Sequence, residues 1–181
     1  MSGWVLRQAQ DKLKSKPPQK LNYLELEILV LNTPEIIKPP ITNLEFLKKL
    51  IPHREPMILV DTLQYHDSTS LISRLLIAEE NLFVIAHQFS EAGILEHMAQ
   101  SVALHTGYSG YLSKKATREG YIGAIKKAEI LQLPKVGEII TTQVTISYSA
   151  MDMTLVTIES KVNEKLIATA EMSTVLKPIA P

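Results

Sequence analysis

The strongest constraint on the fold of this chain is a long helix pattern that begins after Ser90. Serine is a good N-cap residue, and the residues after it predict a helix that ends near Tyr108 or Leu112. Gly107 and Gly110 are expected to weaken its end. Its apolar residues recur every three to four positions and form one wide face: Ile94, Leu95, Met98, Ala99, Val102 and Ala103. Since such a face must be buried, another layer of the protein has to cover it.

Six stretches of the chain have the composition of β-strands. They are rich in Ile, Leu, Val and Thr, and turn-forming residues separate them. They cover residues 57–64, 69–76, 121–133, 138–148, 154–163 and 165–176. The first two predict a hairpin, and the last four follow one another closely, which favours antiparallel pairing. We therefore expect an α+β fold in which an antiparallel sheet of about six strands wraps around one long central helix.

The length of 181 residues fits one domain with a short attachment, because two cores of about 90 residues each would be marginal. We expect an N-terminal extension of unknown role over residues 1–42 and the main domain over residues 43–181. Thr42 and Glu45 form a capping-box pattern at the start of this domain, which predicts a short helix that Pro52 ends.

Composition excludes several classes of function. The 19 basic and 19 acidic residues cancel, so no overall field favours nucleic acid. Cysteine is absent, which excludes disulfides, thiolate metal sites and cysteine nucleophiles and is typical of a reducing compartment. No apolar run has the roughly 18 to 20 residues of a membrane span. We expect a cytoplasmic protein without a membrane span. His97 and His105 are too far apart in sequence for a helical zinc pair, so no metal site is expected.

Two segments of the chain carry a family resemblance. Residues 50–61 read LIPHREPMILVD and residues 96–100 read EHMAQ. Together they resemble the β-hydroxyacyl-acyl carrier protein dehydratases of type II fatty acid synthesis, which have the hot-dog fold. The likeness extends over about 43–181. The loop before the helix is shorter than in that family and lacks its two Pro-Gly pairs, which is similar to the dehydratases of aryl polyene and flexirubin-type pigment synthesis.

The resemblance implies a reaction, a substrate carrier and a site. The reaction would remove water from a 3-hydroxyacyl thioester in fatty acid or polyketide pigment synthesis. The substrate would be carried on the phosphopantetheine of acyl carrier protein or on coenzyme A, and no other cofactor is expected. Glu96 matches the family's helix glutamate and would be the acid or acid/base, and His87, nine residues earlier, would be the base.

Substrate binding is expected at the start of the helix. The first backbone amides of a helix have no partner inside it and favour developing negative charge, so they suit a thioester oxygen. Gly93 would allow close approach, and Gln100 lies one turn beyond Glu96 on the same face. The expected substrate-binding residues are Ala92, Gly93, Ile94 and Gln100.

Other interpretations of single residues remain open. His53 lies in the best-matching segment, but its position is not the catalytic one of the family, which favours a structural role. Glu91 is a substitute acid or base in one interpretation and a complement to the helix dipole in the favoured one. A basic cluster after the helix predicts weak docking of an acidic carrier protein, although such clusters are usually solvated surface. It comprises Lys114, Lys115, Arg118, Lys126 and Lys127.

The assembly and the reaction class also have alternatives. A single domain of this kind leaves a sheet edge open, so we expect a homodimer or a heterodimer with another hot-dog subunit. A thioesterase is the first alternative function, in which Glu96 would activate water. A catalytically silent acyl-binding or partner subunit is the second, suggested by the shortened loop.

Overall fold

The computed structural model describes residues 36–115 and 120–177. The chain separates into two units, Met1–Ile36 and Ile37–Pro181, and the elements below belong to the second. Ile41 is buried and pairs with Leu63 by two backbone hydrogen bonds of 2.8 and 2.9 Å. Residues 37–42, which the sequence analysis assigns to the extension, are therefore attached to the domain. Most of the expected extension, residues 1–35, lies outside the described residues.

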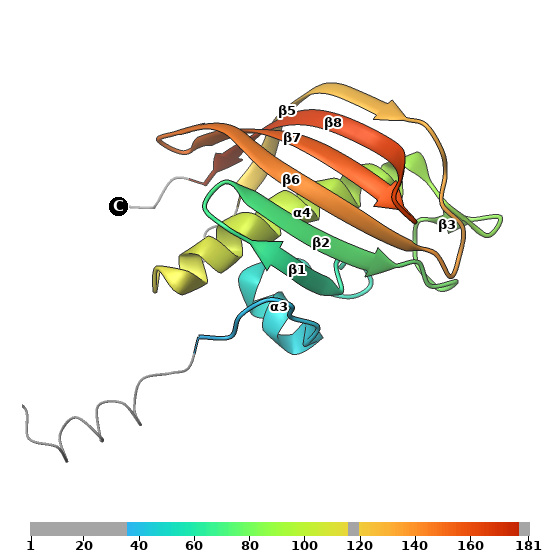
Figure 1. Cartoon of the computed structure of the whole chain (residues 1–181), viewed down its shortest axis with the longest axis horizontal. Coiled ribbons are helices and arrows are strands. Elements are labelled where there is room, and N and C mark those ends of the chain that lie inside the picture. The colour runs from blue at the N-terminus through green and yellow to red at the C-terminus, as the bar shows by residue number, and fades with distance from the viewer. Residues whose placement is uncertain (1–35, 116–119, 178–181) are drawn as a thin grey trace, which may run out of the picture. The chain divides into compact units, whose positions relative to one another are not determined.

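A six-stranded antiparallel sheet wraps around the long helix α4 (Glu91–Leu112), as Figure 1 shows. The strand order is β1-β2-β6-β7-β8-β5. The strands are β1 (Thr62–His66), β2 (Ser70–Leu76), β5 (Gly120–Ile130), β6 (Ile139–Ala150), β7 (Met153–Val162) and β8 (Lys165–Leu176). The α+β architecture predicted from the periodicities is confirmed.

The core lies between α4 and the sheet. Ile94, Met98 and Leu104 of α4 are fully buried, as are Leu71 of β2 and Ile140 of β6. Burial of each such side chain contributes roughly 1.5–3 kcal/mol. Four buried residues of the same helix are polar, which the apolar pattern does not predict: His97, Gln100, Ser101 and His105. The inner face of α4 is therefore partly polar.

The N-terminal ends of the two helices are capped by side chains. Ser90 has extended backbone angles, and its hydroxyl accepts a hydrogen bond from the N–H of Gly93, which confirms the predicted start of α4. The short helix α3 (Leu44–Leu50) is capped by Asn43, whose side chain accepts from the N–H of Phe46 at 2.9 Å. The capping box predicted at Thr42 is thus wrong by one residue, because Asn43 supplies the capping oxygen.

Two parts of the chain between the helices differ from the predicted strands. Residues 57–61 were predicted as the start of a strand, but β1 begins only at Thr62. A small hairpin of β3 (Val84–Ile85) and β4 (Gln88–Phe89) precedes α4 and was not predicted. Its turn residues Ala86 and His87 have positive φ angles of 50° and 60°, without the glycine or asparagine that usually signals such a turn.

Gly107 marks the closest approach of the two helices. A Cβ atom at this position would lie 1.9 Å from the carbonyl oxygen of Leu50, the last residue of α3. No side chain fits at that distance, so glycine permits the contact. The close packing of α3 against α4 therefore explains why a glycine, which weakens a helix, stands at this position.

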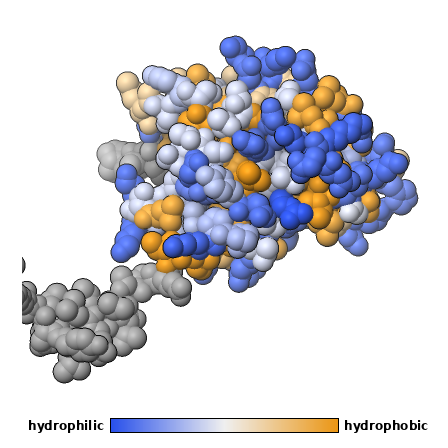
Figure 2. Space-filling view, in the orientation of Figure 1, coloured by the Kyte–Doolittle hydropathy of each residue, from blue (hydrophilic) through white to orange (hydrophobic). Residues whose placement is uncertain are grey.

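The surface is mixed in character. Figure 2 shows apolar patches between polar ones on one face of the molecule. Strand β5 is exposed along nearly its whole length and has β8 as its paired neighbour in the sheet. Tyr121, Ile122 and Ile125 of β5 are 43 to 57% exposed. Among the described residues, no helix has the length and apolar character needed to cross a membrane.

Candidate active site

Glu96 and His53 form a pair at the side of α4. Glu96 lies in the second turn of the helix, and His53 lies in the loop that follows α3. The Nε2 atom of His53 is 3.6 Å from Oε1 of Glu96, slightly longer than a hydrogen bond. Both side chains are half-buried, with exposed fractions of 30% and 29%. The structure thus places a carboxylate and an imidazole together, the two groups most used for proton transfer.

Gln100 lies one turn beyond Glu96 and contacts it directly. Its Nε2 donates to Oε1 of Glu96 at 2.8 Å and to the carbonyl oxygen of Met57 at 2.7 Å. Its Oε1 accepts from the N–H of Leu59 at 2.7 Å. The side chain is fully buried and is not part of a cavity wall, so Gln100 does not have the open position expected of a substrate-binding residue.

His97 holds the same loop from the interior. Its Nδ1 lies 2.6 Å from the carbonyl oxygen of Leu59, which requires that Nδ1 carries the proton. Complete burial lowers the pKa of His97 from 6.5 to about 4, against a smaller opposing effect of that hydrogen bond. His97 is therefore neutral near pH 7, and its Nε2 is buried without a partner among the described residues.

A cavity of about 130 Å³ opens beside the Glu96–His53 pair. Its helix side consists of residues on one stripe of α4, including Glu96, Ala99 and Ala103. Ile122 of β5 and Leu176 of β8 belong to the opposite side. A cavity that combines apolar side chains with the Glu96–His53 pair fits an acyl chain whose functional group is held at that pair.

A second cavity of about 240 Å³ continues along the same helix. Three residues line both cavities: Val102, Thr106 and Leu176. The two cavities are therefore adjacent. The second is bounded further by Ser109 of α4 and Ile146 of β6. Because α4 rises about 1.5 Å per residue, the distance from Glu96 to Thr106 along the helix is roughly 15 Å.

In the first turn of α4, two backbone amides already donate hydrogen bonds to the capping residue Ser90. The N–H of Gly93 donates to the Ser90 hydroxyl at 3.3 Å, and that of Ile94 donates to the Ser90 carbonyl at 3.0 Å. A Cβ atom at Gly93 would lie 2.6 Å from Cβ of Phe83, and Ile94 is fully buried. The structure corrects the expectation that these amides lack partners. Of the three expected positions in this turn, Ala92 is the exposed one.

His87 lies apart from this pair within the chain. It is in the turn of the β3–β4 hairpin, where its Nδ1 contacts the carboxylate of Glu79 at 2.9 Å. Its side chain is 81% exposed and does not line either cavity. The sequence does not indicate that His53 is the neighbour of Glu96, although the motif of residues 50–61 contains this histidine.

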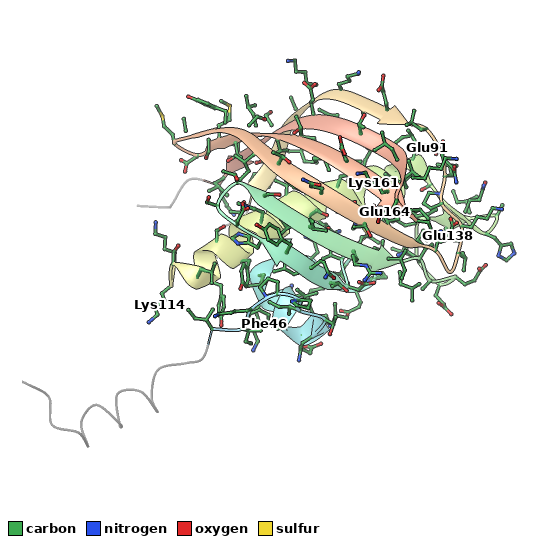
Figure 3. The ribbon with its side chains drawn as sticks, in the orientation of Figure 1. Phe46, Glu91, Lys114, Glu138, Lys161 and Glu164 are labelled. Carbon is green, nitrogen blue, oxygen red and sulfur yellow. The ribbon has the colours of Figure 1, made fainter. Side chains whose placement is uncertain are left out.

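The basic residues expected to dock a carrier occupy separate places. Figure 3 shows Lys114 at one end of α4 and Glu91 at the other. Lys126 and Lys127 lie in β5, where they pair with Glu171 at 3.7 Å and Glu129 at 3.2 Å. The six residue steps along β5 from Gly120 to Lys126 span about 20 Å. Lys115 follows Lys114 at the helix end, whereas Arg118 lies outside the described residues.

Metal ligands do not cluster in the described part of the chain. No group of three or more His, Cys, Asp or Glu side chains there has an arrangement that would hold a metal ion.

Solved structures identify the class of fold. The dehydratase heterocomplex ApeI:P from Xenorhabdus doucetiae matches with a TM-score of 0.69 and 14% identity, covering 73% of this chain and 91% of that chain. The E. coli PaaI protein of the phenylacetic acid degradation operon has a TM-score of 0.52 and 10% identity, with 62% and 80% covered. A hypothetical thioesterase with coenzyme A from Streptococcus pneumoniae has a TM-score of 0.53 and 8% identity, with 66% and 87% covered. The chain has the hot-dog fold.

A sequence profile then narrows the class to a family. The profile of the ApeP-like dehydratases matches residues 46–179, and the chain belongs to this family. A comparison with curated proteins gives no match. The family resemblance seen in residues 50–61 and 96–100 is confirmed, including its link to aryl polyene dehydratases.

Proposed function

We propose that this protein is a 3-hydroxyacyl-thioester dehydratase of aryl polyene or related polyketide synthesis. The observation that supports this most directly is the Glu96–His53 pair at the mouth of an apolar cavity. Membership in the ApeP-like dehydratase family supports the same reaction class. The fold alone would not, because it also occurs in a protein described as a thioesterase.

Glu96 is the proposed acid/base. Its carboxylate takes the proton from C2 of the substrate, and the electron pair is delocalised onto the thioester oxygen. In this proposal the exposed amide of Ala92 at the start of α4 stabilises that oxygen. Protonated Glu96 then gives the proton to the 3-hydroxyl group, the C3–O bond breaks, water leaves and the C2–C3 double bond forms. The carboxylate is thereby restored.

His53 is proposed to donate a hydrogen bond rather than to take a proton. Its Nδ1 is buried and has no partner among the described residues, so a proton there would be an unsatisfied buried donor. The neutral ring therefore carries its proton on Nε2, which faces the carboxylate of Glu96. From this position, Nε2–H orients the carboxylate or the 3-hydroxyl group of the substrate.

The test is a turnover assay with 3-hydroxyacyl thioesters on acyl carrier protein and on coenzyme A. We expect wild type to form the enoyl thioester, and Glu96→Gln and His53→Ala to lose about 10²-fold or more in kcat. His87→Ala is the matched control, because the family resemblance implies that His87 is the base. Wild-type activity in Glu96→Gln would contradict the proposal, and loss in His87→Ala alone would restore His87 as the base. Free acid instead of enoyl product would indicate a thioesterase.

We also propose that the site works in an assembly of two hot-dog subunits. One similar solved structure is a heterocomplex. The exposed strand β5, whose Ile122 lines the cavity, offers an open edge beside the site. Edges of this kind are favourable places for pairing with another sheet. A substrate carried by acyl carrier protein remains part of this proposal, to be distinguished from coenzyme A by the assay above.

A further inference from the structure

Gln100 is the buried residue that connects both members of the proposed catalytic pair. It contacts the carboxylate of Glu96 on its own helix. It also makes two hydrogen bonds to the backbone of residues 57–59, which follow His53 in the chain. His97 adds a third hydrogen bond to this segment through the carbonyl of Leu59. The loop that carries His53 is therefore held on α4 at the position of Glu96.

The orientation of the Gln100 amide follows from its neighbours. The backbone N–H of Leu59 can only donate, so the atom facing it must be the amide oxygen. The carbonyl of Met57 can only accept, so the atom facing it must be the amide nitrogen. The same nitrogen then presents its second hydrogen to Glu96, and this hydrogen bond requires an accepting oxygen there.

The two contacts of Glu96 fall on one oxygen. Gln100 lies 2.8 Å and His53 lies 3.6 Å from Oε1, whereas the described residues give Oε2 no partner. The hydrogen bond from Gln100 to Oε1 fixes the orientation of the carboxylate plane. Oε2 is then the oxygen that can take a proton from the substrate and return it.

We propose that Gln100 is a positioning residue for the dehydration: it orients the carboxylate of Glu96 so that Oε2 is free for the substrate, and it holds the His53 loop beside it. This inference rests on the proposed function. Gln100 is fully buried and lines neither cavity, so it acts through Glu96 and not by touching the substrate.

The experiment compares Gln100→Leu with Ser101→Ala in the full chain. Ser101 is buried on the same helix and hydrogen-bonds to Ser73 and to the carbonyl of His97, but not to Glu96 or to the His53 loop. Both variants lose buried hydrogen bonds, and urea unfolding measures that loss. We expect kcat of Gln100→Leu to fall about 10²-fold with KM within about twofold of wild type, since a misplaced catalytic group slows the reaction more than it weakens binding.

The split between kcat and KM separates positioning from a merely structural role. Ser101→Ala should keep both kcat and KM of wild type, although it also loses buried hydrogen bonds. Gln100→Glu provides a second variant if Gln100→Leu does not fold, because it keeps an acceptor for Leu59 and removes the donor to Glu96. We expect kcat to fall in this variant as well, with KM near that of wild type.

The outcomes distinguish the two proposals. An inactive wild-type protein would overturn the proposed function together with this inference. An active wild type with unchanged kcat in the Gln100 variants would overturn the inference alone. An equal loss of kcat in Ser101→Ala would reduce Gln100 to a structural residue and also overturn it.

Discussion

His53 belongs to the loop after α3, and His97 of α4 hydrogen-bonds to the same segment. The two histidines nevertheless have different surroundings. His53 is half-buried and faces a carboxylate at the edge of a cavity. His97 is enclosed in the core, where burial lowers its pKa to about 4. The same residue type is thus available for chemistry in one place and held neutral in the other. Sequence alone does not distinguish them, because local spacing does not report burial.

Acid should destabilise the fold through His97. Between its unfolded pKa of 6.5 and its folded pKa of about 4, the unfolded chain binds a proton that the folded chain does not. Stability is therefore full above pH 6.5 and falls as the pH decreases, by about 1.4 kcal/mol per pH unit for one such group. Burial also lowers the pKa values of His66 and His105, which act in the same direction.

Urea unfolding at neutral pH and near about pH 5 measures this slope. His97→Gln removes the titrating group and keeps a donor for the carbonyl of Leu59. We expect the variant to be less stable than wild type at neutral pH but to lose less stability on acidification. If wild type and His97→Gln lose the same amount of stability between the two pH values, His97 is not the group responsible.

At the scale of elements, α3 and α4 approach each other closely at Gly107. Gly107→Ala would push a Cβ atom into the carbonyl of Leu50, which can be relieved only by moving a helix. We expect a loss of about 3 kcal/mol or more in the free energy of unfolding. Gly110→Ala is the matched control, since its nearest neighbour would be at 3.6 Å and alanine favours a helix by about 1 kcal/mol. Equal stabilities in a urea titration would contradict the close contact.

The two cavities along α4 predict selection of acyl length. Ile146 lines only the second cavity, so Ile146→Trp should fill it and leave the space beside Glu96 open. We expect kcat/KM to fall about tenfold or more for a long 3-hydroxydodecanoyl thioester, because methylenes lose their apolar environment. A short 3-hydroxybutyryl thioester should be turned over as by wild type. An equal effect on both substrates would show that the second cavity does not hold the chain.

The elements themselves were largely predictable. Helix α4 begins after Ser90 and ends at Leu112, β1 and β2 form the predicted hairpin, and the four later strands are confirmed within a few residues. The predictions failed for residues 57–61, whose apolar run suggests a strand. Met57 and Leu59 hydrogen-bond to side chains of α4, whereas Asp61 already hydrogen-bonds to the backbone of Arg74 in β2. A tertiary contact of this kind leaves no periodic signal.

At the scale of the whole molecule, β5 lies at one edge of the sheet, and the described part of a single chain gives that edge no further strand to pair with. Tyr121, Ile122 and Ile125 are exposed there. We expect light scattering to give the mass of a dimer for the purified protein, and Ile125→Lys to lower it toward a monomer because charges oppose pairing of an edge. Leu76→Lys on β2 is the control, as Leu76 is 51% exposed but lies away from β5 in the sheet order. A monomeric wild type would contradict pairing between copies.

The sequence by itself determined the helix and most strands and marked Glu96 as a candidate, because periodicity, capping and a short motif are properties of neighbouring residues. Only the tertiary structure decided which histidine meets Glu96. His53 is 43 residues away in the chain, whereas His87 is nine away, yet His53 is the one at 3.6 Å. The reason is physical: buried hydrogen bonds from Gln100 and His97 hold the His53 loop on α4, while a tight hairpin turn directs His87 into solvent.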